Sequence, residues 1–220
     1  MEKRKYESKN RYLVSLLIAT LVFLLIFAIS YSISYLELQR VSNLQVGVGY
    51  DIFQDKLDYS LFNASICNDN SLNKVSKDLG FQGRIIDDLE RRLGKQNENV
   101  LLRKQFYSLI ELEHFEFVRD FNKNCVKPWE TEERINTIFF FYSNNESYLK
   151  DSEEAGRILE SVVNRNENLL VYSFDVDLSS NLVDKLERKY GVTESPTVVI
   201  NEKTKLKLPA NILEIEKYLF

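Results

Sequence analysis

The feature that most constrains this chain is a run without any charged residue, from Tyr12 to Leu36, with the sequence YLVSLLIATLVFLLIFAISYSISYL. At about 1.5 Å per residue, a helix of this length exceeds the roughly 30 Å hydrocarbon core of a bilayer. Tyr12, Tyr31 and Tyr35 lie near its ends, where interfacial aromatic side chains are favoured. The run therefore predicts one transmembrane helix over residues 12–36.

The charges that flank this run predict its orientation. The tail of residues 1–11 carries five Lys/Arg against two Glu, whereas residues 37–55 show no basic excess. The positive-inside rule then leaves the N-terminus in the cytoplasm and places residues 37–220 on the extracytoplasmic side. A cleaved signal peptide is the alternative, since Ala28-Ile29-Ser30 has small residues at the spacing of a cleavage site. Both interpretations predict that the C-terminal part is exported.

The net charge of the exported part argues against nucleic-acid binding. The chain has 220 residues and a net charge of −4, and removing the +3 of the N-terminal tail leaves −7 for residues 36–220. Proteins that bind nucleic acids need a basic surface to neutralise phosphates. We therefore expect the membrane, an exported polypeptide or another membrane protein as partner, and no nucleic acid.

An antiparallel helical hairpin is predicted over residues 71–125. In the first helix, apolar and amide side chains follow an alternating spacing of three and four residues, at Leu72, Val75, Leu79, Gln82, Ile86, Leu89 and Leu93. Gly94 ends this helix, and Asn97 caps a second helix that begins at Glu98. The short connection makes the helices antiparallel neighbours. The apolar positions of the second helix are Leu102, Phe106, Leu109, Ile110, Leu112, Phe115 and Val118.

The two cysteines, Cys67 and Cys125, stand just before the first of these helices and just after the second. Both therefore fall at the open end of the hairpin, and an exported protein can form disulfides. A bond between them would close a loop of about sixty residues and stabilise the fold by roughly 4 kcal/mol in the chain-entropy model. The alternative is two buried or reactive thiols.

Two segments connect the predicted parts. Residues 37–70 are predicted to be a partly helical juxtamembrane segment, interrupted where Gly47 and Gly49 disfavour a helix. Residues 126–134 contain Pro128 and a cluster of charged residues. Such a composition is typical of a linker.

From residue 135 the pattern changes to that of an α/β domain. Apolar runs predict strands, and amphipathic spacing predicts a helix that Asp151 or Ser152 caps, a second helix that stops at Gly191 and a last helix from Asn211 to Tyr218. The expected strands are residues 135–142, 169–174, 197–200 and 205–209. The order strand, helix, strand, helix, strand, strand, helix indicates an α/β fold with a mixed sheet.

The stretch FDVDLSSNLVDKLERKYGVTESPTVVI, residues 174–200, resembles the thioredoxin superfamily. The resemblance covers about residues 135–220 and implies a thioredoxin-like domain in which Pro196 is a cis-proline beside the site. A trans proline that starts an edge strand is the alternative. Redox-active members carry C-x-x-C after the first strand, but the corresponding segment here, YSNNESYLKDSEEAG, has no cysteine. We therefore expect no dithiol chemistry in this domain.

The resemblance also implies where a partner would bind. In the family, the backbone before the cis-proline can pair with an extended chain, which is recognition by strand addition. The residues of this expected groove are Tyr142, Asn144, Asn145, Ser195, Pro196 and Thr197. Two alternatives stay open: a structural or assembly protein that acts, or forms a homo-oligomer, through the helical region, and a thiol–disulfide oxidoreductase that uses Cys67 and Cys125.

Other polar residues give weaker indications. His114 is the chain's one histidine and is expected to be exposed or to cap a helix, since a lone histidine has no catalytic partners. Asp175 and Asp177 are interpreted as the polar end of a strand, and Asp177 is expected to cap the next helix. We expect no metal site and no cofactor. Asn63 and Asn145 each begin a glycosylation acceptor pattern.

Overall fold

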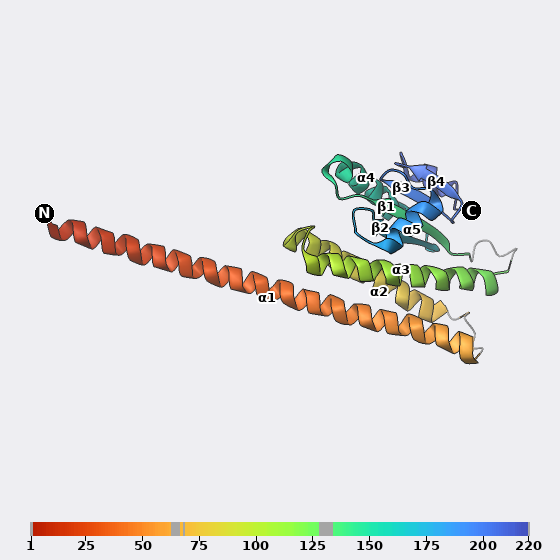
Figure 1. Ribbon diagram of the computed structural model, residues 1–220, viewed down its shortest axis with the longest axis horizontal. Coiled ribbons are helices and arrows are strands. Elements are labelled where there is room, and N and C mark those ends of the chain that lie inside the picture. Colours follow the sequence, from red (N-terminus) through yellow and green to blue (C-terminus); the bar gives the residue numbers. More distant parts are fainter. Residues whose placement is uncertain (1, 63–66, 68, 128–133, 220) are drawn as a thin grey trace. The chain divides into compact units, whose positions relative to one another are not determined.

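The computed structural model describes residues 2–62, 67, 69–127 and 134–219. It divides into two compact units, Met1–Arg40 and Val41–Phe220, which are described separately. The helices and strands (Figure 1) are α1 (Glu2–Phe62), α2 (Asp69–Leu93), α3 (Glu98–Asn124), β1 (Asn136–Tyr142), α4 (Glu146–Val163), β2 (Leu169–Asp175), α5 (Asn181–Tyr190), β3 (Thr197–Ile200), β4 (Thr204–Lys207) and α6 (Ile212–Glu216).

The first unit is the N-terminal part of α1, which contains the apolar run. Among the residues described, one helix is long and apolar enough to cross a membrane, and it includes the predicted span. Its hydroxyl groups donate to carbonyls of the same helix: Ser15 to Tyr12 O at 3.0 Å and Thr20 to Leu16 O at 2.9 Å. Such internal bonds suit a helix in hydrocarbon, where no water is available. The predicted apolar helix is confirmed, and its insertion and orientation stay predictions.

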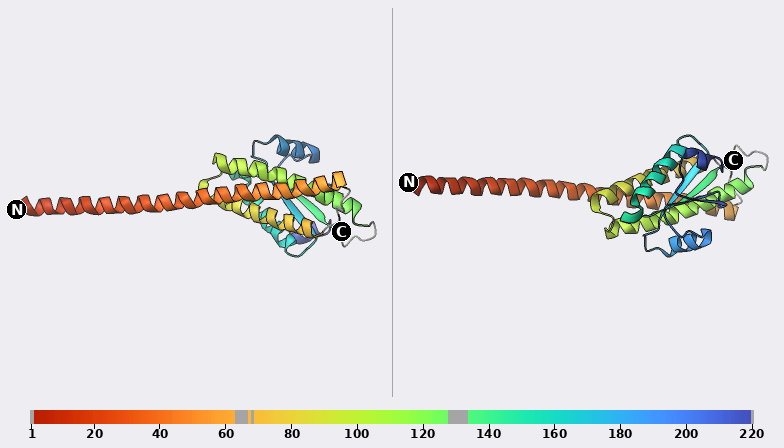
Figure 2. Two further views of the ribbon diagram at one scale, coloured as in Figure 1. Left: turned by 90° about the horizontal axis from the view of Figure 1, so that it is seen from below. Right: turned by 90° about the horizontal axis from the view of Figure 1, so that it is seen from above.

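The predicted interruption near Gly47 and Gly49 is wrong, because α1 continues to Phe62. Val48 and Ile52 are buried in one cluster with residues of α2 and α3, and Figure 2 shows this part of α1 beside both helices. A glycine costs a helix about 1 kcal/mol relative to alanine. Burial of two large aliphatic side chains contributes more than that, so packing outweighs local propensity.

Both helices of the predicted hairpin are present. Gly94 follows α2 with φ of +93°, a conformation that glycine adopts readily. Asn97 is the N-cap of α3, where its side chain accepts from the amides of Asn99 at 3.0 Å and Val100 at 3.4 Å. These two residues set where α2 ends and α3 begins. The predicted stripe of α2 is confirmed at five positions, since Val75, Leu79, Gln82, Ile86 and Leu89 are all buried, whereas Leu93 is half-buried.

A disulfide joins Cys67 and Cys125, as predicted, with the two Cα atoms 5.4 Å apart. Cys125 is also the C-cap of α3, where its amide donates to Phe121 O at 2.8 Å. The bond ties the end of α3 to the chain just before α2. It closes the open end of the hairpin covalently.

The four-stranded sheet has the order β2-β1-β3-β4. β1 pairs in parallel with β2 and antiparallel with β3, and β3 pairs antiparallel with β4. The predicted α/β fold with a mixed sheet is therefore confirmed. The peptide bond between Ser195 and Pro196, directly before β3, is cis.

The predicted start of one helix, α4, needs correction. α4 begins at Glu146, and its N-cap is Asn145, whose side chain accepts from the amide of Ser147 at 3.1 Å. Asp151 and Ser152 therefore lie inside the helix. Ser152 is buried there, and its Oγ accepts from the amide of Ser143 at 3.1 Å. Asn145, nearly two turns before the predicted pair, is the residue that caps the helix.

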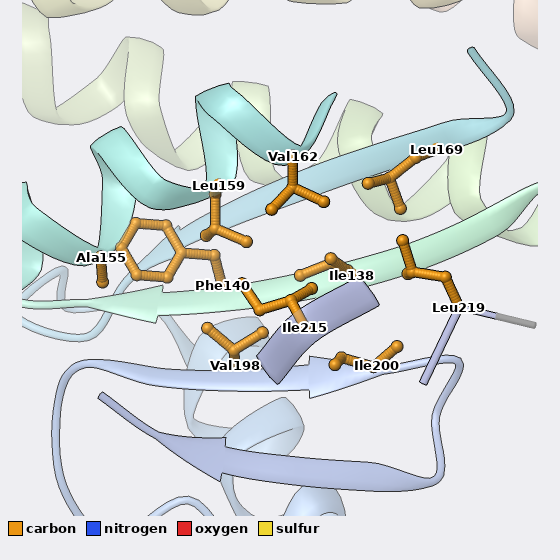
Figure 3. Packing of buried hydrophobic residues seen from close by; sticks show 10 residues of the cluster. All are labelled: Ile138, Phe140, Ala155, Leu159, Val162, Leu169, Val198, Ile200, Ile215 and Leu219. Atoms are coloured by element: carbon orange, nitrogen blue, oxygen red, sulfur yellow. The ribbon is translucent and has the colours of Figure 1, made fainter. Parts of the chain in front are cut away.

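Helices cover both faces of the sheet. On one face, α4 and α6 pack against β1 and β3 in an apolar core (Figure 3) of Ile138, Phe140, Ala155, Leu159, Val162, Leu169, Val198, Ile200, Ile215 and Leu219. On the other face, Phe115 of α3 and Val183 and Leu186 of α5 pack against Phe139 and Tyr172. Because α3 contributes to this second core, the hairpin and the sheet are parts of one folded unit.

Replacement of Cys67 or Cys125 by serine is expected to lower the free energy of unfolding by roughly 4 kcal/mol, since the unfolded chain regains the freedom of a long loop. Urea unfolding of the full chain in detergent, followed by circular dichroism, measures this loss. Either single variant and the double variant should lose the same amount. Unchanged stability in all three, or a wild-type bond that glutathione opens, would contradict a structural disulfide.

Candidate functional site

The loop after β1 is held by a carboxylate. Asp177 Oδ2 accepts from Ser143 Oγ at 2.9 Å, from the Asn144 amide at 2.7 Å and from the Asn145 amide at 3.0 Å. The prediction that Asp177 caps α5 is therefore wrong. The N-cap of α5 is Ser180, which makes no side-chain cap bond. Three donors converge on this one oxygen of Asp177, so the carboxylate fixes the loop in place.

Asn145 combines two roles at this loop. It is exposed and caps α4, so this member of the expected groove has a structural task. Its acceptor pattern for glycosylation lies on the surface, where Ser147 is exposed as well. Glycosylation of Asn145 stays a prediction, and the other acceptor, Asn63, lies outside the described residues.

Ser195, Pro196 and Thr197 lie on the other side of β1, at the start of β3. In the antiparallel pairing of β1 with β3, Phe141 is the partner of Thr197, so Ser195 and Pro196 come next to the end of β1. Thr197 Oγ1 donates to Glu194 O at 2.7 Å. Pro196 and Thr197 are buried and Ser195 is half-buried. Of this group, Ser195 is thus the residue that a partner can reach most easily.

A cavity of about 290 Å³ opens at the carboxyl ends of β1 and β2. It brings Tyr142 and Asn144 together with residues of α2, α3 and β2, whereas Ser195, Pro196 and Thr197 do not line it. The expected groove is therefore divided between two sides of β1. The lining consists of Gly83, Ile86, Asp87, Glu90, Lys104, Tyr107, Ser108, Phe140, Tyr142, Asn144, Ser173 and Asp175.

Lys104 is the centre of a buried ion cluster at this cavity. Its Nζ lies 3.1 Å from Glu90 Oε2 and also donates to Asp175 Oδ2. Asn144 Nδ2 donates to Glu90 Oε1 at 3.1 Å and to Asp175 Oδ2 at 2.9 Å. The side chains of Lys104 and Asp175 are each 6% exposed. The cluster joins α2, α3, β2 and the loop after β1.

The charge state of Lys104 follows from these neighbours. Burial by itself lowers the pKa of Lys104, but Tyr142 and the carboxylates of Asp175 and Glu90 raise it by more, so this pKa lies above its ordinary value. Lys104 is therefore a fixed cation at all physiological pH values. An amine that stays protonated cannot act as a base or a nucleophile, so the cluster is suited to structure rather than catalysis.

The buried face of α3 differs from the predicted one. Leu102 and Leu109, expected in the apolar stripe, are 55% and 50% exposed, whereas Lys104, Ser108 and Glu111 are buried. The reason is the surface on which α3 packs. It lies against the edge strand β2, whose backbone presents polar groups that need partners.

Glu111 shows how α3 satisfies this edge. Its Oε1 accepts from the amide of Ser173 in β2 at 3.0 Å. Burial raises the pKa of Glu111 to about 8, although the Ser173 amide and the Tyr107 hydroxyl act in the opposite direction. At neutral pH most Glu111 side chains are therefore protonated in the folded protein.

His114 is buried, with 1% of its surface exposed, so the predicted exposed or capping role is wrong. Its Nδ1 lies 3.0 Å from the Tyr172 hydroxyl, and its Nε2 lies 3.2 Å from Ser76 Oγ. The three residues come from α2, α3 and β2, far apart in the sequence. No local motif signalled them, and the cavity at Lys104 does not include them.

Neither metal binding nor relatives identify the site. Within the described ranges, no three His, Cys, Asp or Glu side chains are grouped so that they could hold a metal ion. Comparison with protein-family models, with curated proteins and with solved structures finds no match.

Substitution of Lys104 by methionine is expected to lower the free energy of unfolding by about 3–5 kcal/mol, because it leaves the buried Asp175 and the largely buried Glu90 without their cation. Denaturant unfolding measures the loss. Lys189→Met is the matched control: the Lys189–Glu202 pair is more exposed, so about 0–1 kcal/mol is expected there. Equal effects in both variants would show that the buried cluster contributes no more than a surface pair.

Substitution of Glu111 by glutamine is expected to reduce the pH dependence of stability. The folded protein retains the Glu111 proton up to about pH 8, whereas the unfolded chain releases it near the ordinary value of 4.5. The Glu111 contribution to the free energy of unfolding therefore falls as pH rises from 4.5 to 8, by at most about 1.4 kcal/mol per pH unit. Unfolding at several pH values tests this, with Glu113→Gln on the same helix as control. A wild-type slope in Glu111→Gln would contradict it.

Proposed function

We propose that this chain is a membrane-anchored protein whose extracytoplasmic part is a redox-inactive, thioredoxin-like module that binds an exported polypeptide or a membrane protein. α1 supplies the anchor, and its N-terminus faces the cytoplasm. The succession of β2, α5 and β3 across residues 174–200 supports the thioredoxin-like identity, because the resemblance rests on that stretch. Partner binding takes place at the end of β1 and the start of β3.

The observation that carries this function is the absence of a thiol from the loop after β1, where redox-active members of the family have theirs. The loop after β1 has no cysteine, and its amides and the Ser143 hydroxyl are held by Asp177. Both cysteines of the chain are bonded to each other beside the hairpin. A loop that is held in place and has no thiol is suited to recognition, since a preorganised surface loses little entropy on binding.

Ser195 is the contact that we assign to the partner. It is half-buried next to the end of β1, and the two residues before it, Thr193 and Glu194, are exposed. An extended chain that reaches Ser195 can bind through main-chain hydrogen bonds. Tyr142 and Asn144, which line the cavity on the other side of β1, then support the site from behind rather than touch the partner.

A photo-crosslinking amino acid at Thr193 is expected to capture a discrete partner in native membranes, because Thr193 is exposed beside the proposed contact. The same group at Leu213, which is also exposed, is the control and should capture none. Addition of Ser195→Glu should lower the adduct yield about tenfold, equivalent to about 1.4 kcal/mol. Identical adducts from both positions, or a yield that Ser195→Glu leaves unchanged, would remove the proposed site.

A second candidate, an assembly protein that acts through its helices, is favoured by exposed apolar side chains on α1 and α3. Deletion of residues 130–220 is a poor test of this candidate, because Phe115 of α3 packs on Phe139 and Tyr172 of the sheet. Single substitutions on the exposed helical surface are the better test. The third candidate, an oxidoreductase, needs a Cys67–Cys125 bond that weak reductants open.

A further inference from the structure

Six large apolar side chains are exposed together on α1 and α3. They form what we call the α1–α3 face: Val46, Tyr50, Phe53, Leu102, Phe106 and Leu109. Elsewhere in the described part of the compact unit, the exposed large apolar side chains are scattered over α4, α6 and the residue after β4. Isolated exposed apolar residues are normal, whereas a cluster of this size marks an interaction surface.

Contacts between α1 and α3 bring the two halves of this face together. Gln45 Nε2 donates to Arg103 O at 2.9 Å, and Arg103 Nη1 donates to Gln45 Oε1 at 3.3 Å. Seven residues further along both helices, Ile52 and Ile110 belong to one buried cluster. The two helices therefore run in the same direction with a constant register. Val46 follows Gln45 in sequence, and Leu102 precedes Arg103. The exposed apolar residues of α1 and those of α3 therefore border the same line of contact between the two helices.

α2 does not cover this face. It contacts α1 from a different side, where Gln82 Nε2 donates to Leu44 O at 3.2 Å. The left view of Figure 2 shows the C-terminal part of α1 crossing in front of the α2–α3 hairpin, with α3 along one edge of α1 and α2 along the other. The face between α1 and α3 is left to solvent in the single chain, which explains the 65% exposure of Tyr50.

The pattern of the face fits a helical partner. In both helices the apolar residues are spaced by four and then three positions, the spacing of a helix–helix seam. Gly47 and Gly49 lie beside the α1 stripe, and a Cβ at either would meet nothing within 4 Å. Packing inside the chain thus does not require these glycines, although each costs the helix about 1 kcal/mol. Small residues allow a second helix backbone to approach closely.

We propose that the α1–α3 face binds the same face of a second copy of this chain. α1 also carries the apolar span, so all copies anchored in one membrane have the face on the same side of that membrane; this inference therefore rests on the anchoring proposed above. Confinement to a membrane raises the effective concentration of the second copy. A two-fold dimer pairs one patch with itself, and residues 41–50 carry no charge, so like charges do not oppose each other there.

The first test is a cysteine substitution in the full chain in its membrane. Cys67 and Cys125 are bonded to each other, so one added cysteine reports on a second copy. Tyr50→Cys is expected to form a covalent dimer on mild oxidation. Leu213→Cys, also on an exposed apolar position, is the matched control and should stay monomeric. Equal crosslinking of both variants, or an adduct of Tyr50→Cys with a different protein, would overturn the proposal.

The second test measures the mass of the purified full chain in detergent by light scattering. Wild type is expected to be a dimer, and Phe106→Glu should raise its dissociation constant at least about 30-fold, as for the loss of an interface hot spot. Leu213→Glu should leave the dimer intact. Circular dichroism and the mapped Cys67–Cys125 bond check folding, which exposed positions should not disturb. A monomeric wild type, or a Phe106→Glu variant that dimerises as well as wild type, would overturn the proposal.

These outcomes are distinguishable from failure of the proposed function. The mass of the purified chain shows whether the N-terminal helix is retained. Loss of this helix would remove the proposed anchor without testing the α1–α3 face. A retained anchor with a monomeric chain would overturn the dimer alone. Capture of a polypeptide at Thr193 is a separate readout that needs no second copy.

Discussion

Two carboxylates, the buried Asp175 and the largely buried Glu90, lie at the carboxyl ends of β1 and β2, and the ammonium group of Lys104 compensates them. Removing charges from water is costly unless the partners are in good geometry and their remaining sites are filled. Asn144 meets that condition by donating to both carboxylates. Because the four residues come from different parts of the fold, the position of α2 and α3 on the sheet depends on charge pairing as well as on apolar contact.

The features that could be predicted from the sequence are those with local causes. The uncharged run defines an apolar helix, Gly94 and Asn97 define the ends of α2 and α3, and alternating spacing identifies the buried stripe of α2. The face of α3 was mispredicted because apolar spacing assumes an apolar neighbour. Glu111 instead meets the polar edge of β2, and Lys104 meets a carboxylate 71 positions away. Pairings at that separation leave no pattern in a single sequence.

The expected binding residues illustrate the same limit. Tyr142, Asn144 and Asn145 follow one another closely in sequence, yet they line a cavity, bridge two carboxylates and cap a helix respectively. Their closeness in sequence at a strand end predicts that they lie near each other, but it does not predict the structural role of each residue. Structural roles for Asn144 and Asn145 narrow the proposed partner contact to the start of β3, around Ser195.

The place of the disulfide in the chain bears on how the protein matures. Cys125 precedes the first strand, which begins at Asn136. In a chain anchored as proposed, the residues nearest the anchor would cross the membrane first, so both cysteines would reach the oxidising side while the sheet is still being translocated. The helices can then be linked covalently before Lys104 and Glu111 have met their partners in β2. Maturation would proceed from a cross-linked helical intermediate with a hydrated polar face, which closes only when the last strands arrive.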